Sequence, residues 1–209
     1  MLDELPRLHG LAPVENRVLY VQRCGQLDKG NGAHAGETAL VAALRRAGVA
    51  TMDPGQGTIA QQMALYAGAK VLIFAEGSAL HGRQLLGRVD QTILVLRRRP
   101  GSMMASAQLA PRCSRLEYAG VVGGFVAPVH RNGARMLPHG ITFTNLPALF
   151  HVLAQHGVDL SPHWDAAAHR ADVAQDAATW MRAMMARSDV DPAATQRAAQ
   201  PVFAQAGLT

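Results

Sequence analysis

Short apolar runs of β-forming residues alternate with helical patterns through the first half of the chain, and this alternation limits the possible folds most strongly. The strand-like runs are 18–22, 49–52, 70–75 and 91–96, and the helical patterns are 37–47, 58–67 and 78–87. Strands that alternate with helices at this spacing predict a parallel sheet with crossover helices. We therefore expect an α/β fold, with a Rossmann-like domain over residues 17–122.

The pattern changes beyond Tyr118. Two extended segments, at 117–129 and 139–145, precede a helical pattern at 146–157 that opens near Asn145. The alanine-rich tail from Asp191 predicts one more helix. These features divide the chain into an N-terminal segment (1–16), the Rossmann-like domain (17–122) and a C-terminal extension (123–209), mixed at first and then helical.

A longer helix is expected to begin at Ser161-Pro162, with serine as the N-cap and proline in the first turn. Its apolar residues step by three and four along one face, which we expect to pack on the body of the protein. The residues of this face are Trp164, Ala168, Ala171, Ala174, Ala178, Met181 and Met185.

The formal net charge of +5 and a sequence pI of about 9.9 suit a phosphorylated ligand, nucleic acid or an anionic membrane surface. The basic residues are scattered, and the densest run, Arg97–Arg99, precedes a Pro-Gly turn. We therefore expect no nucleic-acid partner. A peripheral contact with a membrane remains open, and oligomeric state is not indicated.

Cysteine and histidine usage predicts neither a disulfide framework nor a metal site. Cys24 and Cys113 form no CxxC pair, and the histidines include no HExxH motif. The first residues lack the pattern of a signal peptide, and no run reaches the roughly 18 apolar residues that span a bilayer. Reduced thiols and a cytoplasmic location are the expectation.

Polar residues stand where the apolar run 70–75 gives way to the next predicted helix. Glu76, Gly77 and Ser78 occupy this position, and His81 follows in the first turn. Ligands of open parallel sheets bind outside the carboxyl ends of the strands, and the N–H groups of a helix start favour an anion. The position predicts a phosphate or diphosphate site, although neither GxGxxG nor GxxxxGKS/T is present.

Two interpretations stay open for these side chains. Glu76 either caps the following helix or serves a ligand, by binding sugar hydroxyls or ribose or by acting as a general base. Ser78 is expected to be the N-cap in either case. His81 is either a surface residue or a donor to a phosphate oxygen.

The order of these segments resembles the C-terminal part of glycosyltransferase family 61. LYVQR supplies Tyr20 and Arg23, where the family has a Tyr-Ile-x-Arg strand, and AGETALVAALRRAGV supplies Glu37. IAQQMALYAGAKVLI supplies Gln62, and AEGSALH falls where the family has a His-Gly-Ala turn. The similarity covers roughly residues 17–96.

The resemblance implies a GT-B-type donor-binding lobe of a bacterial subgroup. It implies sugar transfer from a nucleoside-diphosphate donor to a glycan or other acceptor, with inversion at the anomeric carbon, in surface polysaccharide synthesis. It also implies that neither a divalent metal nor another cofactor is essential. Glu76 stands at the family's histidine position, and His81 is a candidate to take over part of that role.

The resemblance makes Arg23 and Gln62 candidate donor-binding residues, together with Gly77 and Ser78. Arg23 would pair its guanidinium with the diphosphate, or else face solvent at a strand end. Gln62 would bind the base or ribose, or else lie on a helix surface. Glu37 is expected to be a first-turn helix acid.

Two other functions remain open. A full GT-B enzyme has two lobes, and the sequence shows one Rossmann-like unit, so a non-catalytic nucleotide-sugar-binding or interaction module is the main alternative. The chain would then be a fragment or remnant, and an in-frame upstream extension would favour a truncated enzyme. A Rossmann-type dinucleotide enzyme is a third reading, and the absence of GxGxxG counts against it.

Overall fold

A parallel sheet of five strands, in the order β2-β1-β3-β4-β5, lies at the centre of the first half of the chain. The computed structural model describes residues 10–208, so the expected N-terminal segment lies mostly outside the described residues. The strands are β1 (Asn16–Val21), β2 (Ala50–Met52), β3 (Ala69–Ala75), β4 (Thr92–Leu96) and β5 (Arg115–Ala119). All four pairings between neighbours are parallel. The expected α/β fold with crossover helices is confirmed.

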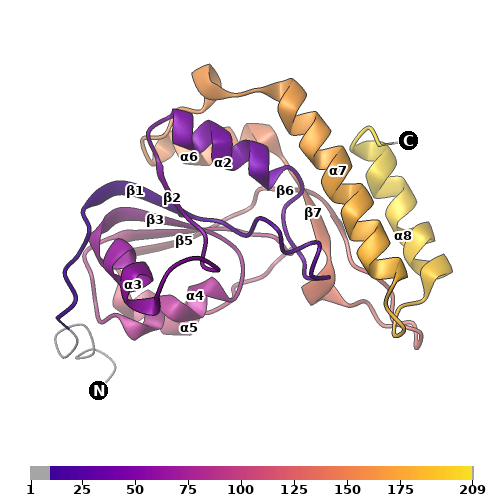
Figure 1. Cartoon of the computed structure of the whole chain (residues 1–209), viewed down its shortest axis with the longest axis horizontal. Helices are drawn as coiled ribbons and strands as arrows, with labels where there is room; N and C mark the ends of the chain where they lie inside the picture. Colours follow the sequence, from indigo (N-terminus) through magenta and orange to yellow (C-terminus); the bar gives the residue numbers. More distant parts are fainter. Residues whose placement is uncertain (1–9, 209) are drawn as a thin grey trace.

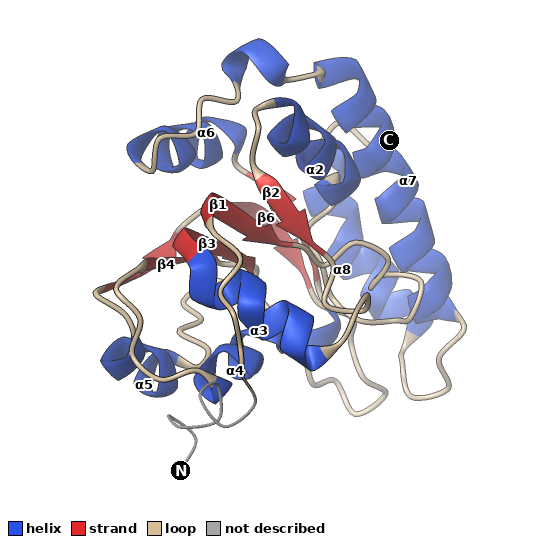
Figure 2. Ribbon diagram, turned by 60° about the vertical axis from the view of Figure 1, so that its left-hand side comes forward, coloured by secondary structure: helices blue, strands red, loops and turns tan. Residues whose placement is uncertain are grey.

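Helices cover both faces of this sheet, as Figure 2 shows. One face carries α2 (Glu37–Arg46) and α6 (Leu146–Gln155). The other carries α3 (Ile59–Gly68), α4 (Ala79–Gly82) and α5 (Ser106–Leu109), with the 3-10 turns η2 (Arg83–Leu85) and η3 (Ala110–Arg112). Burial on both faces explains why the strand runs read as continuous apolar segments instead of alternating ones.

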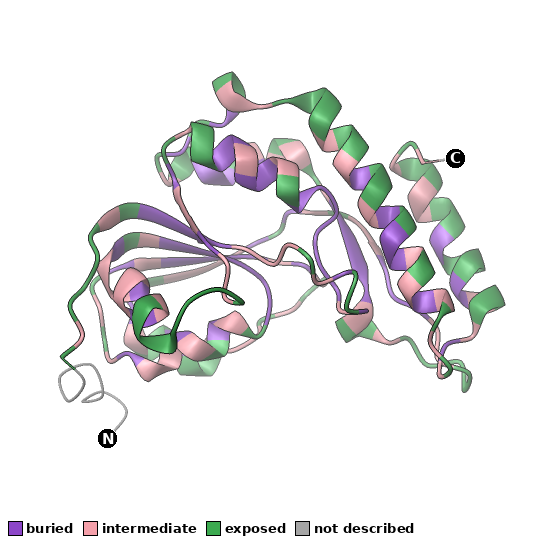
Figure 3. Ribbon diagram, viewed as in Figure 1, coloured by how far each residue is buried: buried purple, intermediate pink, exposed green. Residues whose placement is uncertain are grey.

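Successive strand residues supply the two cores in turn, because side chains alternate across a strand. Tyr20 and Ile73 are fully buried toward α2 and α6, whereas Leu19 and Leu72 are fully buried toward α3 and α4. Figure 3 shows the strands buried along most of their length. The strands therefore form the core, and the loops at their ends are available to carry function.

Local sequence signals set several helix ends as expected. Thr58 forms a capping box with Gln61 at the start of α3, and the Asn145 side chain accepts from Ala148 N at the start of α6. Gly48 follows α2 in the left-handed conformation, with φ of 79°. Asp191 caps α8 (Pro192–Gln205), the predicted C-terminal helix.

Two helix predictions are wrong. The helix expected over 78–87 is a single turn, α4, followed by the 3-10 turn η2. The long helix α7 (Ala166–Met185) begins after Asp165, whose side chain accepts from Ala167 N and Ala168 N. Ser161 instead opens the 3-10 turn η5 (Ser161–His163), so its proline marks a separate turn and not the start of α7.

The buried face of α7 also differs from the predicted one. Val173, Ala177, Trp180 and Met184 are buried, whereas the alanines of the expected face are exposed. Alanine is a weak marker of a buried face, because it is also the best helix former on an exposed one. The buried positions 173, 177, 180 and 184 each lie one residue before the expected positions 174, 178, 181 and 185.

The C-terminal helices cover a second, smaller sheet. Strands β6 (Val122–Val126) and β7 (Ile141–Thr144) pair antiparallel, and the 3-10 turn η4 (Leu137–His139) precedes β7. In Figure 1, α7 and α8 run side by side over this sheet, away from the parallel sheet. Trp180 is fully buried here, and its Nε1 donates to His139 O at 2.7 Å.

The loop after β1 joins the two sheets. Ala35 N donates to Thr142 O at 2.8 Å, and Thr142 N donates to Ala33 O at 3.1 Å, so the loop lies against β7. The Thr142 hydroxyl donates to Arg98 O at 2.6 Å. The predicted boundary at residue 122 is thus crossed by backbone hydrogen bonds from the first half of the chain. Within residues 10–208, no helix has the length and apolar character needed to cross a membrane.

Candidate functional site

The strand order reverses between β1 and β3, because β2 lies on one side of β1 and β3 to β5 lie on the other. A reversal of this kind is a topological switch point, where open α/β sheets bind ligands outside the carboxyl ends of the strands. The loop after β1 begins at Gln22, and the loop after β3 begins at Glu76. The residues predicted from the sequence therefore stand at the expected place in the fold.

A cavity of about 290 Å³ opens at these strand ends, and we call it the sheet-end cavity. Its lining includes Arg23 from the loop after β1, Gln62 from α3 and Ser78 from the loop after β3. These are three of the four predicted donor-binding residues, and they come from three separate elements. Asp53, directly after β2, and the exposed side chain of Ile59 also line it.

Gly77, the fourth predicted donor-binding residue, contacts Arg23. A Cβ atom at Gly77 would clash with the Arg23 guanidinium, so only glycine lets this side chain lie against the backbone after β3. Arg23 Nε donates to Gly32 O at 3.1 Å, which fixes the other edge of the guanidinium. The loops after β1 and β3 thus hold a positive charge at the cavity.

Glu37 anchors the backbone of Arg23. Its Oε1 accepts from Arg23 N at 2.9 Å and from the Tyr20 hydroxyl at 2.7 Å. Glu37 is 2% exposed, and burial raises its pKa to about 7, against the lowering effect of both hydrogen bonds and of the Arg23 charge. The expectation of a first-turn helix acid is correct in position, and its carboxylate also positions Arg23.

Glu76 is fully buried and turns toward the loop after β4, away from the helix that follows it. Its carboxylate accepts from Arg98 N at 2.8 Å, Arg99 Nε at 2.9 Å and the Ser102 hydroxyl at 2.7 Å. Burial alone would raise its pKa, but these hydrogen bonds hold the pKa below the ordinary value. The carboxylate is therefore ionised and fully occupied, so the contacts support neither helix capping nor a general base.

Arg98 adds a buried positive charge beside this carboxylate. Its Nη1 donates to Gly140 O at 3.0 Å and its Nη2 to Pro138 O at 3.3 Å. Burial and the nearby charge of Arg23 lower its pKa to about 10, so it stays charged at neutral pH. Arg23, Arg98 and Arg99 surround the single acid Glu76, and this group, the arginine cluster, carries a net positive charge suited to an anion.

His34 lies next to the arginine cluster and is 4% exposed. Burial and the charge of Arg98 lower its pKa to about 4, so the ring is neutral. Its Nδ1 lies 3.3 Å from the Thr144 hydroxyl, and its Nε2 makes no hydrogen bond to a described residue. A neutral buried imidazole at this point is compatible with the positive charges around it.

Of the remaining predicted site residues, Gln62 and Ser78 lie at the sheet-end cavity and His81 does not. Gln62 lines the cavity, but its Nε2 already donates to Pro54 O at 2.9 Å. Ser78 lines it without the expected capping hydrogen bond, and α4 is too short to supply the expected helix dipole. His81 is exposed on α4 and is absent from the cavity wall, so its catalytic role stays a prediction.

Sequence reasoning missed three features of the site. Asp53 had a usable signal, since an acid directly after the second strand of a Rossmann-like unit often binds ribose. Arg98 and Arg99 stand in a basic run before a Pro-Gly turn, and the sequence does not show their pairing with Glu76 because it depends on β3 and β4 being neighbours. His34 had no sequence signal.

Within the described residues, no group of three or more acidic, histidine or cysteine side chains could hold a metal ion. An Asp-x-Asp sequence occurs at 189–191. Asp189 pairs with Arg187 at 2.7 Å, and Asp191 caps α8. Both acids therefore have structural partners.

Comparison with known proteins gives a match in the N-terminal half of the chain, which contains the sheet-end cavity. Residues 2–83 match the family model described as Glycosyltransferase 61, which supports the resemblance stated above. The match covers less than half of the chain, and it includes Arg23, Gln62 and the whole segment from Glu76 to His81. No curated protein matched the chain at the level taken as significant.

Proposed function

We propose, from the premise of the family 61 match, that this protein transfers a sugar from a nucleoside-diphosphate donor to a glycan or other acceptor, with inversion at the anomeric carbon. The observation that carries the proposal is the convergence of Arg23, Gln62 and Ser78 on one cavity at the switch point. The arginine cluster next to it suits the charge of a diphosphate. Surface polysaccharide synthesis in the cytoplasm is the proposed setting.

In this proposal Arg23 binds the diphosphate, and Gly77 leaves room for the guanidinium beside the backbone. Gln62 and Asp53, which also line the cavity, bind the ribose or the base. Glu76 is a positioning residue, because it holds Arg99 through two hydrogen bonds while the backbone of Arg98 donates to its other oxygen.

The chemistry needs charge stabilisation on the leaving group. A base removes the proton from the acceptor hydroxyl, the new C–O bond forms on one face of the anomeric carbon, and the bond to the diphosphate breaks on the other. The departing diphosphate gains negative charge, which fixed guanidinium groups stabilise without reorganisation. For His81 we propose a part in catalysis on its position in the sequence alone.

A non-catalytic nucleotide-sugar-binding module is the second candidate. The observation that favours it is the full occupation of Glu76 by Arg99, Ser102 and the Arg98 backbone, which removes the most obvious base. Release of nucleoside diphosphate from a nucleotide-sugar separates the two candidates. An enzyme releases it faster than the uncatalysed rate, whereas a binding module leaves the donor intact.

Nucleotide binding is the direct test of the proposed site. We expect millimolar UDP, GDP or CDP to raise the melting temperature of the protein by mass action. Loss of one charge-assisted contact costs about 1.5–3 kcal/mol, so Arg23→Ala should weaken binding at least about 10-fold. Gln62→Ala should weaken it less, because its amide is shared with Pro54 O.

Exposed residues outside the cavity supply the controls. Arg131→Ala and Gln56→Ala each remove a side chain of the same kind without touching the sheet-end cavity. Both variants should bind the nucleotide as the unchanged protein does. Absence of any shift in the unchanged protein at millimolar nucleotide would reject the donor site.

A further inference from the structure

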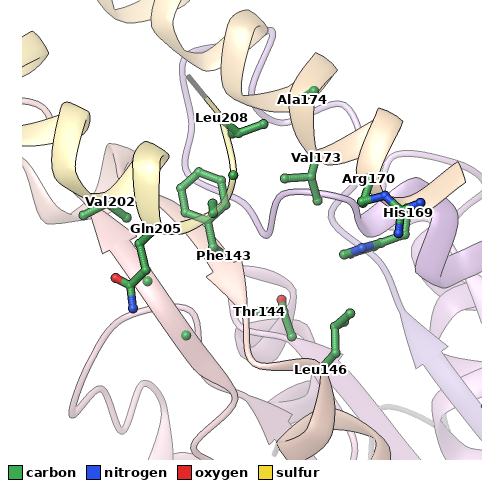
Figure 4. Close-up of a pocket in the computed structure, with 14 residues that line it drawn as sticks. Phe143, Thr144, Leu146, His169, Arg170, Val173, Ala174, Val202, Gln205 and Leu208 are labelled. Carbon is green, nitrogen blue, oxygen red and sulfur yellow. The ribbon is translucent and has the colours of Figure 1, made fainter. Parts of the chain in front are cut away.

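A second cavity lies between α7, α8 and the two-stranded sheet, on the opposite side of the molecule from α3. Its volume is about 550 Å³, which exceeds that of the sheet-end cavity. Cavities of about 300–1,000 Å³ are the usual size for small-ligand sites. Figure 4 shows this C-terminal cavity with the side chains that line it.

Most of the wall is apolar. Phe143 on β7, Val173 on α7 and Val202 on α8 face the same space from three elements. Leu146 and Leu208 extend this lining, and Gly123 and Gly124 on β6 leave the floor without side chains. The described lining is therefore suited to a hydrocarbon chain, which gains from removal of its surface from water.

One end of the cavity carries a positive charge. Arg170 on α7 lines it and is exposed, and within the described residues its side chain forms neither an ion pair nor a hydrogen bond. Gln205 and His169 also line the cavity, whereas no aspartate or glutamate does. The electrostatic character of the wall thus favours an anion at the end where Arg170 lies.

We propose that the C-terminal cavity binds an alkyl or acyl chain that ends in an anionic group. The hydrocarbon lies against Phe143, Val173 and Val202, and the anionic end pairs with Arg170. Guanidinium groups bind both carboxylate and phosphate in a fork geometry, so a fatty acid and a lipid phosphate share the required chemistry. The proposal goes beyond the glycosyltransferase function and does not depend on it, because the cavity is formed by residues 123–208.

Calorimetric titration of the full chain with ten-carbon ligands tests this site, with the anions below their micellar concentrations and the alcohol below its solubility limit. Decanoate represents the fatty acid, decyl phosphate the lipid phosphate, and decanol the same chain without charge. We expect saturable binding of one anion per chain, at least about 5-fold tighter than decanol. The anion that binds more tightly shows whether the ligand is a fatty acid or a lipid phosphate.

Matched variants connect binding to the cavity. Ala174→Leu fills the cavity from α7, whereas Ala178→Leu makes the same change one turn along the helix, outside the cavity. Only the first should weaken all three ligands, by about 10-fold or more. Arg170→Gln should reduce affinity for the anions to that for decanol, whereas Arg197→Gln, an exposed arginine on α8, should change nothing.

Three results would overturn the proposal. These are the absence of saturable binding to the unchanged protein, equal affinity for decanol and both anions, and wild-type affinity in the Ala174→Leu variant. Melting temperatures of all four variants show whether each is folded, since the changes fall on exposed helix positions. Binding of nucleotides is a separate measurement, so failure here leaves the donor site untouched.

Discussion

The carboxyl group of Glu37 joins the first turn of α2 to the end of β1, and burial gives it an unusual affinity for a proton. Its pKa rises to about 7, mainly through burial, and Asp176 nearby acts in the same direction. Only Oε1 has hydrogen-bond partners, Tyr20 and Arg23, and Oε2 has none among the described residues. The folded protein therefore holds the Glu37 proton more tightly than the unfolded chain does.

We expect Glu37 to make stability fall as pH rises from about 5 to 8. The folded state holds the proton up to a pKa of about 7, whereas the unfolded chain releases it near its ordinary value. The proton on Glu37 stabilises the folded state fully at pH values below the pKa of the unfolded chain. This stabilisation is lost as pH rises through the pKa of the folded state. A shift of this size corresponds to about 3 kcal/mol.

Glu37→Gln removes this titration and keeps an oxygen acceptor for Tyr20 and Arg23. Urea unfolding at pH 5, 6, 7 and 8 should show that the free energy of unfolding falls less with pH in the variant than in the unchanged protein. Glu15→Gln, at an exposed position, serves as the control and should leave the decline as it is. Parallel declines in the Glu37 variant and the unchanged protein would mean that Glu37 is ionised throughout.

At the scale of the elements, α7 supplies the caps that α2 lacks in its own sequence. Asp176 Oδ2 accepts from Gly36 N at 2.9 Å, and Asp172 Oδ2 accepts from Ala39 N at 2.8 Å. Gly36 itself offers no side chain, so the first turn of α2 depends on a helix more than 130 residues away. The same turn carries Glu37, so α7 supports the position of Arg23 indirectly.

Replacing these caps should destabilise the protein. We expect Asp172→Ala and Asp176→Ala to lower the free energy of unfolding by about 1 kcal/mol each, the usual cost of a lost N-cap. Asparagine at either position keeps an oxygen acceptor and should cost less. Urea titration at pH 8, which lies above the pKa of about 6 for Asp176 and of about 7 for Glu37, provides the measurement. An alanine variant with an unchanged midpoint would show that the cap is not stabilising.

The elements that the sequence predicted well are those with strong local signals. Apolar β-forming runs located β1 to β4, and Thr58 and Gly48 marked helix ends through their own backbone chemistry. The start of α7 was misplaced because Ser161-Pro162 is also a good start for a 3-10 turn. Its buried face differs from the predicted one because alanine, which makes up most of the predicted face, is equally common on exposed helix faces.

At the scale of the whole molecule, local sequence patterns predict only the part of the site that lies directly at a strand end. Gly77 and Ser78 follow from the rule that ligands bind at the carboxyl ends of parallel strands, whereas Arg23 and Gln62 are implied by the resemblance to family 61. The partners of Glu76 do not follow, because they require the order of the strands in the sheet. The C-terminal cavity depends on how α7 and α8 pack on β6 and β7, which no local pattern indicates.

Contacts between the two sheets argue for a molecule that unfolds as one unit. The loop after β1 pairs with Thr142 through two backbone hydrogen bonds, Arg98 donates to Gly140 O, and α7 caps α2. None of these contacts survives if either half unfolds alone. Separation would also leave the guanidinium of Arg98 with fewer partners, which is costly for a buried charge.

The positions of the tryptophans make this cooperativity measurable. Trp164 and Trp180 are the only two in the chain, and both lie beyond residue 122, whereas far-ultraviolet circular dichroism reports helices of both halves. We expect tryptophan fluorescence and circular dichroism to give the same urea midpoint and the same slope, as in a two-state transition. A fluorescence transition at clearly lower urea would show that the C-terminal helices unfold first and that the hydrogen bonds across residue 122 do not couple the two sheets.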